Sequence, residues 1–446
     1  MPTSLSRRGA LRLGAAAAGL GTAWAASGCS PGSDRGAMQF WQFYAPISQN
    51  DPVLVAQSDW FLTLARRWER AGERPIRMVY IPGYTDPTNT RLTTAFAAGD
   101  GPDIFLISPG DFLRYYNGGV LTDLTPYLSQ EVVDDFYPEA LATRTVDGRI
   151  YGLPMEQGPM AVYYNIPAFE DAGLAEGDLP RTWEDMLELG RRLTGGQQAG
   201  LVLDTTASYY QNFTFYPWVW QGGGDVIDRR TGQAVFDSPA AVQALRLFHD
   251  AVRTGASPRT LPAGGDMVGA FTNGYAAMWH NVIGQVEAMR RNAPDHPYGI
   301  FPLPLPPGGH ERTILGGWAW VVNRHGRDPE AAARFTVEVM GSMSRESVQA
   351  AAEWDGVAKG IMPARRSVTE AIGNTGAFAN PILQQFRDEL LPTGRAEPRY
   401  PPVVYKAVSN AIQKTMLAGA DPQQQAEIAQ ETIVSYLQTY DGGSLV

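Results

Sequence analysis

Residues 98–107 read Ala-Gly-Asp-Gly-Pro-Asp-Ile-Phe-Leu-Ile, and this stretch contains the junction that decides the fold class. The apolar residues between Leu92 and Phe96 have helical spacing, and Gly99 is the residue type that commonly ends a helix. After the Gly-Pro pair, residues 103–107 form a short apolar run that is typical of a strand. The stretch therefore predicts a helix, a tight loop and a strand in succession.

The same pattern extends towards the N-terminus. Residues 38–44 and 75–81 are two further runs of aromatic and β-branched residues that are fit for strands. Between them, apolar residues from Phe61 to Trp68 have helical spacing. Strand, helix, strand, helix, strand in this order indicates a parallel sheet with right-handed crossovers, so the sequence predicts an α/β fold.

A second α/β section follows along the chain. Residues 160–165 read as a strand, and Thr182 with Asp185 three residues later forms a capping-box signal at the start of a helix. Residues 318–322 read as a later strand, and the tail from residue 403 onward has a largely helical pattern. Two α/β sections in one chain favour two domains.

The N-terminus has the features of an export signal. Three arginines, at positions 7, 8 and 12, lead into an apolar stretch over residues 13–24 that is too short to span a bilayer stably. The segment resembles a twin-arginine signal, although Ala10 replaces the usual Phe, and the Sec route stays open. Residues 1–28 are therefore predicted to be a signal peptide, and the mature protein is expected outside the cytoplasm.

Cys29 is the only cysteine of the chain and directly follows this segment, in Ala-Ser-Gly-Cys. That arrangement resembles a lipobox, in which the cysteine thiol receives a lipid that anchors the protein to the cell membrane. Residues 29–37 are then a lipid-anchored linker. A single cysteine also excludes an internal disulfide, so the fold must be stabilised by its apolar core.

Length and charge limit the classes of partner. Removal of 28 residues from the 446 leaves 418, which is enough for two domains of ordinary size. The removed segment contains three arginines and no acidic residue, so the net charge falls from −10 to −13. A strongly acidic chain disfavours nucleic acid as a partner.

At this point a series of short segments, in a fixed order, resembles the family 1 extracellular solute-binding proteins, relatives of maltose-binding protein. The segments are residues 98–104 (AGDGPDI), 118–124 (GGVLTDL), 151–154 (YGLP), 163–165 (YYN), 172–174 (AGL), 180–183 (PRTW), 220–223 (WQGG), 271–278 (FTNGYAAM) and 315–318 (LGGW). The resemblance implies a two-lobe, periplasmic-binding-protein-like fold of type II with a hinge and a ligand cleft between the lobes. The N-terminal lobe is expected over residues 38–153 and 300–355, and the C-terminal lobe over residues 154–299 and 356–446.

The resemblance also implies a function. The chain is expected to be the substrate-binding lipoprotein of an ABC importer, a monomer that binds a mono- or oligosaccharide and delivers it to a membrane permease. Two alternatives stay open: a lipid-anchored glycoside hydrolase, or the same fold binding a non-sugar solute such as a polyol phosphate.

Enzyme signatures are missing from the sequence. The five histidines are scattered without the spacing of metal ligands, and neither a Gly-x-Ser-x-Gly elbow nor a phosphate-binding Gly-x-x-x-x-Gly-Lys-Ser/Thr loop occurs. We therefore expect no catalysis, no metal and no cofactor.

A sugar-binding pocket needs flat aromatic rings for the C–H faces of the ligand, and amides and carboxylates for its hydroxyl groups. Residues of these types in segments that follow predicted strands are the candidates, because ligands of open α/β sheets bind beyond the carboxyl ends of strands. Residues 216–223 are expected to be extended, with two indoles on one side. Trp318 is the foremost candidate because two glycines precede it and leave room for a ligand. The predicted ligand contacts are Trp41, Tyr44, Ser108, Asp111, Glu156, Gln157, Trp218, Trp220, Trp279, Asn281, Gly317, Trp318, Trp354 and Arg365.

Overall fold

The computed structural model describes residues 36–44, 52–82, 84, 90–261, 267–373 and 376–445. Nearly all of them belong to one compact unit, Ala37–Val446. The predicted signal peptide and Cys29 lie outside the described residues. Of the helices in the described part of the chain, none combines the length and apolar character needed to cross a membrane.

The first sheet has five strands in the order β2-β1-β3-β13-β6. Strand β1 pairs in parallel with β2 and β3, whereas β13 runs antiparallel to β3 and β6. The predicted strand–helix–strand–helix–strand unit is therefore confirmed, and we call the part built on this sheet the N-terminal lobe. Its strands are β1 (Met38–Gln42), β2 (Ile76–Tyr80), β3 (Ile104–Ile107), β6 (Leu153–Pro154) and β13 (Ala319–Val322).

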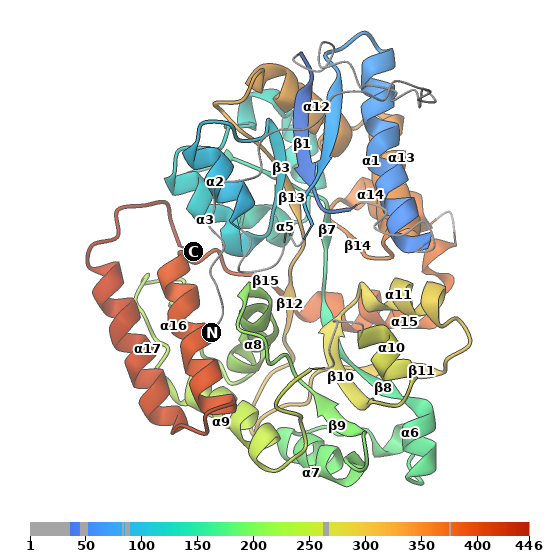
Figure 1. Cartoon of the computed structure of the whole chain (residues 1–446), viewed down its shortest axis with the longest axis vertical. Coiled ribbons are helices and arrows are strands. Elements are labelled where there is room, and N and C mark those ends of the chain that lie inside the picture. Colours follow the sequence, from blue (N-terminus) through green and yellow to red (C-terminus); the bar gives the residue numbers. More distant parts are fainter. Residues whose placement is uncertain are drawn as a thin grey trace, which may run out of the picture. The chain divides into compact units, whose positions relative to one another are not determined.

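Helices cover both faces of the first sheet (Figure 1). Apolar residues of α1, α12 and α13 pack with Phe40 and Trp320 on one face, while residues of α2 and α3 pack with Trp41 and Phe105 on the other. A sheet with both faces buried needs apolar strands throughout, which is what β3 shows. These helices are α1 (Pro52–Arg70), α2 (Arg91–Ala97), α3 (Pro109–Asn117), α12 (Pro329–Met340) and α13 (Arg345–Glu353).

The second sheet has four strands in the order β11-β8-β10-β9 and forms the centre of the C-terminal lobe. The predicted capping box at the start of α7 is present: the Thr182 hydroxyl accepts the Asp185 N–H at 3.1 Å, and the Asp185 carboxylate accepts the Thr182 N–H at 3.2 Å. The strands are β8 (Met160–Asn165), β9 (Ala199–Val202), β10 (Ala276–Val282) and β11 (Tyr298–Phe301). The helices around them include α6 (Ile166–Asp171), α7 (Trp183–Leu193), α8 (Tyr209–Gln221), α9 (Pro239–Arg253), α10 (Met267–Thr272), α11 (Gln285–Asn292), α14 (Arg366–Gly373) and α15 (Pro381–Gln385).

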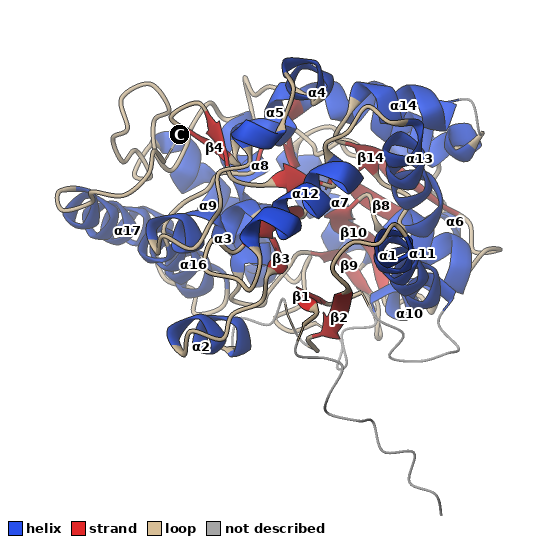
Figure 2. Cartoon of the chain, turned by 90° about the horizontal axis from the view of Figure 1, so that it is seen from above, coloured by secondary structure: helices blue, strands red, loops and turns tan. Residues whose placement is uncertain are grey.

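The C-terminal tail is helical, as predicted. Helices α16 (Pro402–Met416) and α17 (Pro422–Leu437) pack on each other and on α9, and α16 also contacts α8. Figure 2 shows this helical layer beside the strands. Helix α8 is therefore enclosed on several sides by other helices.

The chain passes between the two sheets after β6, after β11 and again after α13. The first and third of these segments are hydrogen-bonded to each other, because β7 (Glu156–Gln157) pairs with β14 (Met362–Pro363). The second contains β12 (Thr313–Leu315), which pairs with β15 (Gly394–Ala396).

Two expected lobe boundaries fall inside strands. Pro154 pairs with Ala319 and still belongs to the first sheet, and β11 lies wholly in the second sheet although a boundary was expected between residues 299 and 300. Gly299 is a residue type typical of linkers, but it lies in a strand. A glycine is needed at this position because a Cβ would collide with the ring of Tyr164. A glycine required by packing cannot be distinguished from a linker glycine in the sequence.

Candidate functional site

A cavity of about 740 Å³ lies between the two sheets. One wall comes from segments that follow β1, β2 and β3 in the N-terminal lobe, as expected for an open α/β sheet. The other wall comes from residues 204–213 and 282–284 of the C-terminal lobe, and the crossing segments close the base. A cavity of this size can hold a small organic solute.

Aromatic rings form much of the N-terminal wall. Trp318 is half-buried and lines the cavity, with its ring centroid 4.7 Å from that of Phe43 and 6.2 Å from that of Tyr84. Gly317 has φ +139°, and a Cβ at this position would collide with the backbone oxygen of Glu156. The glycine therefore lets the chain turn beside Glu156 and directs the indole of Trp318 to the cavity.

The C-terminal wall is also aromatic, and sequence reasoning missed these residues. Tyr209, Tyr210 and Phe213 all line the cavity from α8. The rings of Tyr210 and Phe213 are stacked with centroids 5.8 Å apart. The Tyr209 hydroxyl accepts a hydrogen bond of 2.6 Å from Arg114 on the opposite wall, so this contact joins the lobes.

Glu156 holds the base of the cavity together. Its side chain forms an ion pair with Lys359 from the third crossing segment and accepts a hydrogen bond of 2.8 Å from the Trp354 indole N–H. The Lys359 ammonium also donates to the Tyr44 hydroxyl at 2.8 Å. Glu156 and Lys359 line the cavity, whereas Tyr44 and Trp354 support them from behind.

The start of α3 contributes Ser108, Asp111 and Arg114 to the N-terminal wall. Asp111 lies in the first turn of this helix and Arg114 one turn later, with 3.5 Å between carboxylate and guanidinium. Burial raises the pKa of the Asp111 carboxyl, and the neighbouring Arg114 opposes that shift.

Two further carboxylates line the cavity and were not predicted. Burial raises the pKa of Asp204 to about 6, although the N–H of Thr206 hydrogen-bonds its carboxylate. Burial also raises the pKa of Glu397 to about 8, opposed by the charge of Arg144 and the N–H of Gly110. The only signal for these residues is their charge, which many surface residues share.

Five of the six predicted tryptophans lie in the core instead of the cavity wall: Trp354, which supports Glu156 from behind, and Trp41, Trp218, Trp220 and Trp279. Residues 216–221 belong to α8, which contradicts the extended chain expected there. All residues of this helix from 211 to 221 are buried, so Trp218 is fully buried and Trp220 is 3% exposed. Trp279 belongs to β10 and packs against Tyr163 of β8 and Phe271 of α10. Trp41 lies buried on β1.

The remaining predicted contacts have structural partners. Gln157 donates to the Pro363 oxygen at 2.8 Å and so connects two crossing segments. Arg365 is buried in an ion pair of 2.7 Å with Asp135. Asn281, inside β10, accepts a hydrogen bond of 2.7 Å from Tyr210 and thereby fixes a ring that does line the cavity.

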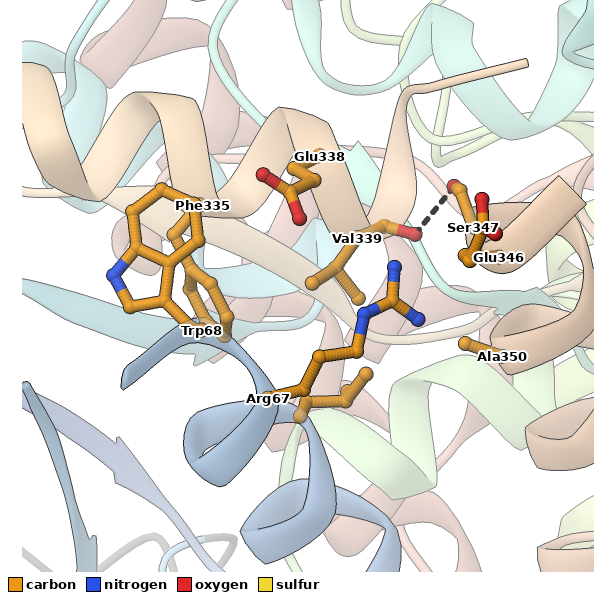
Figure 3. Close-up of a pocket in the computed structure, with 9 residues that line it drawn as sticks. Arg67, Trp68, Phe335, Glu338, Val339, Glu346, Ser347 and Ala350 are labelled. Carbon is orange, nitrogen blue, oxygen red and sulfur yellow. Dashed lines mark hydrogen bonds between the residues drawn. The ribbon is translucent and has the colours of Figure 1, made fainter. Parts of the chain in front are cut away.

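A second depression lies between α1, α12 and α13 (Figure 3). Trp68, Phe335 and Val339 are among its lining residues, and the Ser347 hydroxyl donates to the Val339 oxygen at 2.7 Å. Its volume of about 10 Å³ corresponds to a single water molecule. It is therefore a gap in helix packing and offers no room for a solute.

Carboxylates are the most frequent charged groups of the large cavity, which raises the question of a metal. Among the residues that the structure describes, no group of three or more His, Cys, Asp or Glu side chains could hold a metal ion. The chemistry of the cavity is that of aromatic rings, hydroxyl groups and carboxylates.

Comparisons with known proteins agree with this architecture. A family model described as bacterial extracellular solute-binding protein matches residues 57–338. A binding protein of Brucella abortus (strain 2308) is 25% identical over 227 residues, which are 50% of this chain and 54% of that protein. The arabinooligosaccharide-binding protein of Bacillus subtilis (strain 168) is 24% identical and covers 74% of this chain and 79% of its own. The chain thus spans about half the length of the Brucella relatives it matches.

Solved structures show the same two-domain fold. The GacH receptor of Streptomyces glaucescens, studied unliganded and with acarbose, has a TM-score of 0.74 at 21% identity and covers 91% of this chain and 99% of its own. Maltose-bound MalE3 of T. maritima has a TM-score of 0.73 at 20% identity over 90% of this chain and 99% of its own. UgpB of Mycobacterium tuberculosis, in complex with glycerophosphocholine, has a TM-score of 0.74 at 21% identity over 91% and 100%. The predicted two-lobe α/β fold is confirmed.

Proposed function

Since this chain belongs to the bacterial extracellular solute-binding proteins, we propose that it binds a mono- or oligosaccharide reversibly in the cavity between its lobes and delivers it to the permease of an ABC importer. The observation that carries the proposal is the composition of the cavity, whose two walls present aromatic rings beside carboxylates and hydroxyl groups. A sugar ring has an apolar C–H face that stacks on such rings and hydroxyl groups that donate to carboxylates.

Several similar proteins support a carbohydrate as ligand. A relative is named for arabinooligosaccharides, and solved neighbours contain maltose or acarbose. Glycerophosphocholine in another neighbour represents the alternative of a phosphate-bearing solute. A phosphate group calls for free arginines or backbone N–H groups, whereas Arg114 and Lys359 of the wall are already ion-paired. The carbohydrate is therefore the better match.

The relatives are described as binding proteins, and this favours binding without catalysis over a glycoside hydrolase. A thermal-shift screen of the purified protein against neutral and charged sugars tests the proposal. We expect saturable stabilisation by at least one saccharide, because a ligand that binds only the native state raises the melting temperature. Product formation during the same incubation would establish a hydrolase, and stabilisation by phosphodiesters alone would establish the alternative ligand.

We also propose that the hinge consists of the three crossing segments. Residues 155–159, 302–318 and 354–363 connect the sheets, and the β7–β14 pair joins two of them. On this basis the N-terminal lobe ends near residue 154 and resumes near residue 319, with a final passage near residue 355. Functioning as a monomer is part of the proposal.

Members of this family act outside the cytoplasm, and we propose that this chain is exported by its residues 1–28 and anchored through a lipid on Cys29. Replacement of the thiol removes the site of acylation, so Cys29→Ser is expected to release the protein from the membrane fraction. Fractionation of cells that express the wild type and the variant measures this. Membrane retention of the variant at the wild-type level would contradict the anchor.

A further inference from the structure

The charged groups of the cavity are not balanced. Its described wall contains the carboxylates of Asp111, Glu156, Asp204 and Glu397 but only two cationic side chains, and each of the two is ion-paired within the wall. Arg114 pairs with Asp111, and Lys359 pairs with Glu156. The carboxylates of Asp204 and Glu397 therefore remain without an ion-paired cation among the described residues.

Glu397 is the more buried of the two, with 5% of its surface exposed, and its side chain lines the cavity. Its carboxylate accepts the Gly110 N–H. Arg144 acts on it from behind the wall, but the guanidinium donates to the oxygens of Ala140, Thr143 and Gly317. One oxygen of Glu397 lies 3.3 Å from the position of a Cβ on Gly316, and the Phe213 ring borders the same position.

Phe213 and Tyr210, whose rings are stacked, form an aromatic pair, and Asp204 acts on Tyr210. The only hydrogen-bond donor to the Asp204 carboxylate among the described residues is the Thr206 N–H, and the charge of Asp204 acts on the Tyr210 hydroxyl. Tyr210 is 39% exposed, and its ring stacks with that of Phe213. Each ring of the aromatic pair thus has a neighbouring carboxylate that forms no ion pair with any described residue.

We propose that Asp204, Glu397 and the stacked rings of Tyr210 and Phe213 form a subsite for a cationic amine, so that the carbohydrate bound by this protein carries a basic amino group. This inference rests on the proposed function. An ammonium group is attracted both to carboxylates and to the faces of aromatic rings, and both attractions strengthen in a cavity from which water is excluded. The raised pKa values of both carboxyls are consistent with this role, because a buried carboxylate without a cation favours its protonated form.

Matched pairs of sugars test the inference. Acarbose and maltotetraose, deacetylated chitobiose and cellobiose, and glucosamine and glucose each combine an amine with a neutral counterpart. Titration calorimetry at neutral pH and physiological ionic strength is expected to show the amine binding at least about tenfold more tightly in at least one pair. Asp204→Asn and Glu397→Gln are each expected to reduce that preference at least about fivefold while affinity for the neutral sugar changes less.

Glu188→Gln is the matched control, because Glu188 is an exposed carboxylate of α7 outside the cavity wall and its loss changes the net charge equally. An equal loss of preference in this control would show that the amine is attracted by the overall negative charge, which would overturn the subsite. Binding of neutral sugars without amine preference would also overturn it and leave the proposed function intact. Binding of no sugar at all would overturn both. Melting curves of the variants show whether each is folded.

Discussion

Trp318 and Trp320 lie two residues apart in the sequence and have different environments. Trp320 is fully buried on β13, with its ring 4.6 Å from that of Phe40, whereas Trp318 precedes the strand and lines the cavity. Residues at positions i and i+2 of one strand point to the same face. In agreement with this, Trp318 packs against the same core cluster as Trp320, but it precedes β13 and is only partly buried because its other side borders the cavity.

Replacement of the two indoles should separate binding from stability. Trp318→Ala is expected to weaken affinity for the ligand at least about tenfold, roughly 1.4 kcal/mol, with little effect on the melting temperature of the ligand-free protein. Trp320→Ala, the control, should cost about 3–5 kcal/mol of unfolding free energy because it leaves a core cavity. Titration and scanning calorimetry measure both quantities. Unchanged affinity with a large loss of stability in Trp318→Ala would place this residue in the core.

Glu397 should make stability depend on pH. Its folded-state pKa of about 8 lies above the ordinary value of 4.5, so between these pH values the folded protein binds a proton that the unfolded chain has lost. The contribution of Glu397 to the unfolding free energy is therefore fully present below about pH 4.5. It is lost as the pH rises towards 8, by up to about 4 kcal/mol. Desolvation is the main cause of the raised pKa of Glu397. The charge of Arg144 lowers this pKa, and the charge of Asp111 raises it.

Glu397→Gln removes this titration. Denaturant unfolding of ligand-free wild type and variant at pH 5, 6, 7 and 8 is expected to show a wild-type free energy that declines relative to the variant. Parallel pH profiles would mean that Glu397 titrates normally in the folded protein.

At the scale of elements, the loop between β12 and β13 joins the base of the cavity to its wall. Gly317→Ala would force the backbone away from Glu156, whose oxygen occupies the space of the new Cβ, and would also require an unfavourable φ. We expect a loss of at least about 2 kcal/mol in unfolding free energy and a weaker affinity for the ligand, since Trp318 shifts as well.

Gly308→Ala, in the segment that precedes β12, is the control for Gly317→Ala. Gly308 also has a positive φ, of +70°, but nothing lies within 4 Å of its Cβ position. Its replacement should therefore cost about 1 kcal/mol, for backbone strain alone, and leave affinity unchanged. Equal losses of unfolding free energy in both variants would show that the close approach of Gly317 to Glu156 does not contribute to stability.

At the scale of the whole molecule, the cavity is bordered by both lobes, and only the crossing segments are covalently common to them. A ligand that contacts both walls stabilises the arrangement in which they lie closest. Small-angle scattering is expected to show a smaller radius of gyration when the protein is saturated with its sugar. The same titration with Trp318→Ala should require at least about tenfold more sugar. An unchanged radius at saturation would contradict closure.

Much of the fold could be predicted from the sequence because its signals are local. Strand and helix periods, the capping box at Thr182 and glycines at helix ends depend on neighbours within a few residues. The order of the family segments extended these local signals to a two-lobe architecture. Helix α8 was the exception, since its residues 211–221 are all buried and its polar and apolar residues are not separated onto two faces, so the sequence shows no helical period there.

The sequence by itself thus determined the α/β class, the two lobes and the presence near the strand ends of residues that line the cavity, among them Ser108, Asp111 and Trp318. Only the tertiary structure decided which aromatic residues face the cavity and which of its carboxylates have no ion-paired cation in the described part of the chain. Trp218 and Tyr209 lie on the same helix, yet Trp218 is enclosed by the core and Tyr209 reaches Arg114 on the opposite lobe's wall. Burial and ion pairing arise from contacts between segments up to hundreds of residues apart, such as Glu156 with Lys359, and no local pattern encodes them.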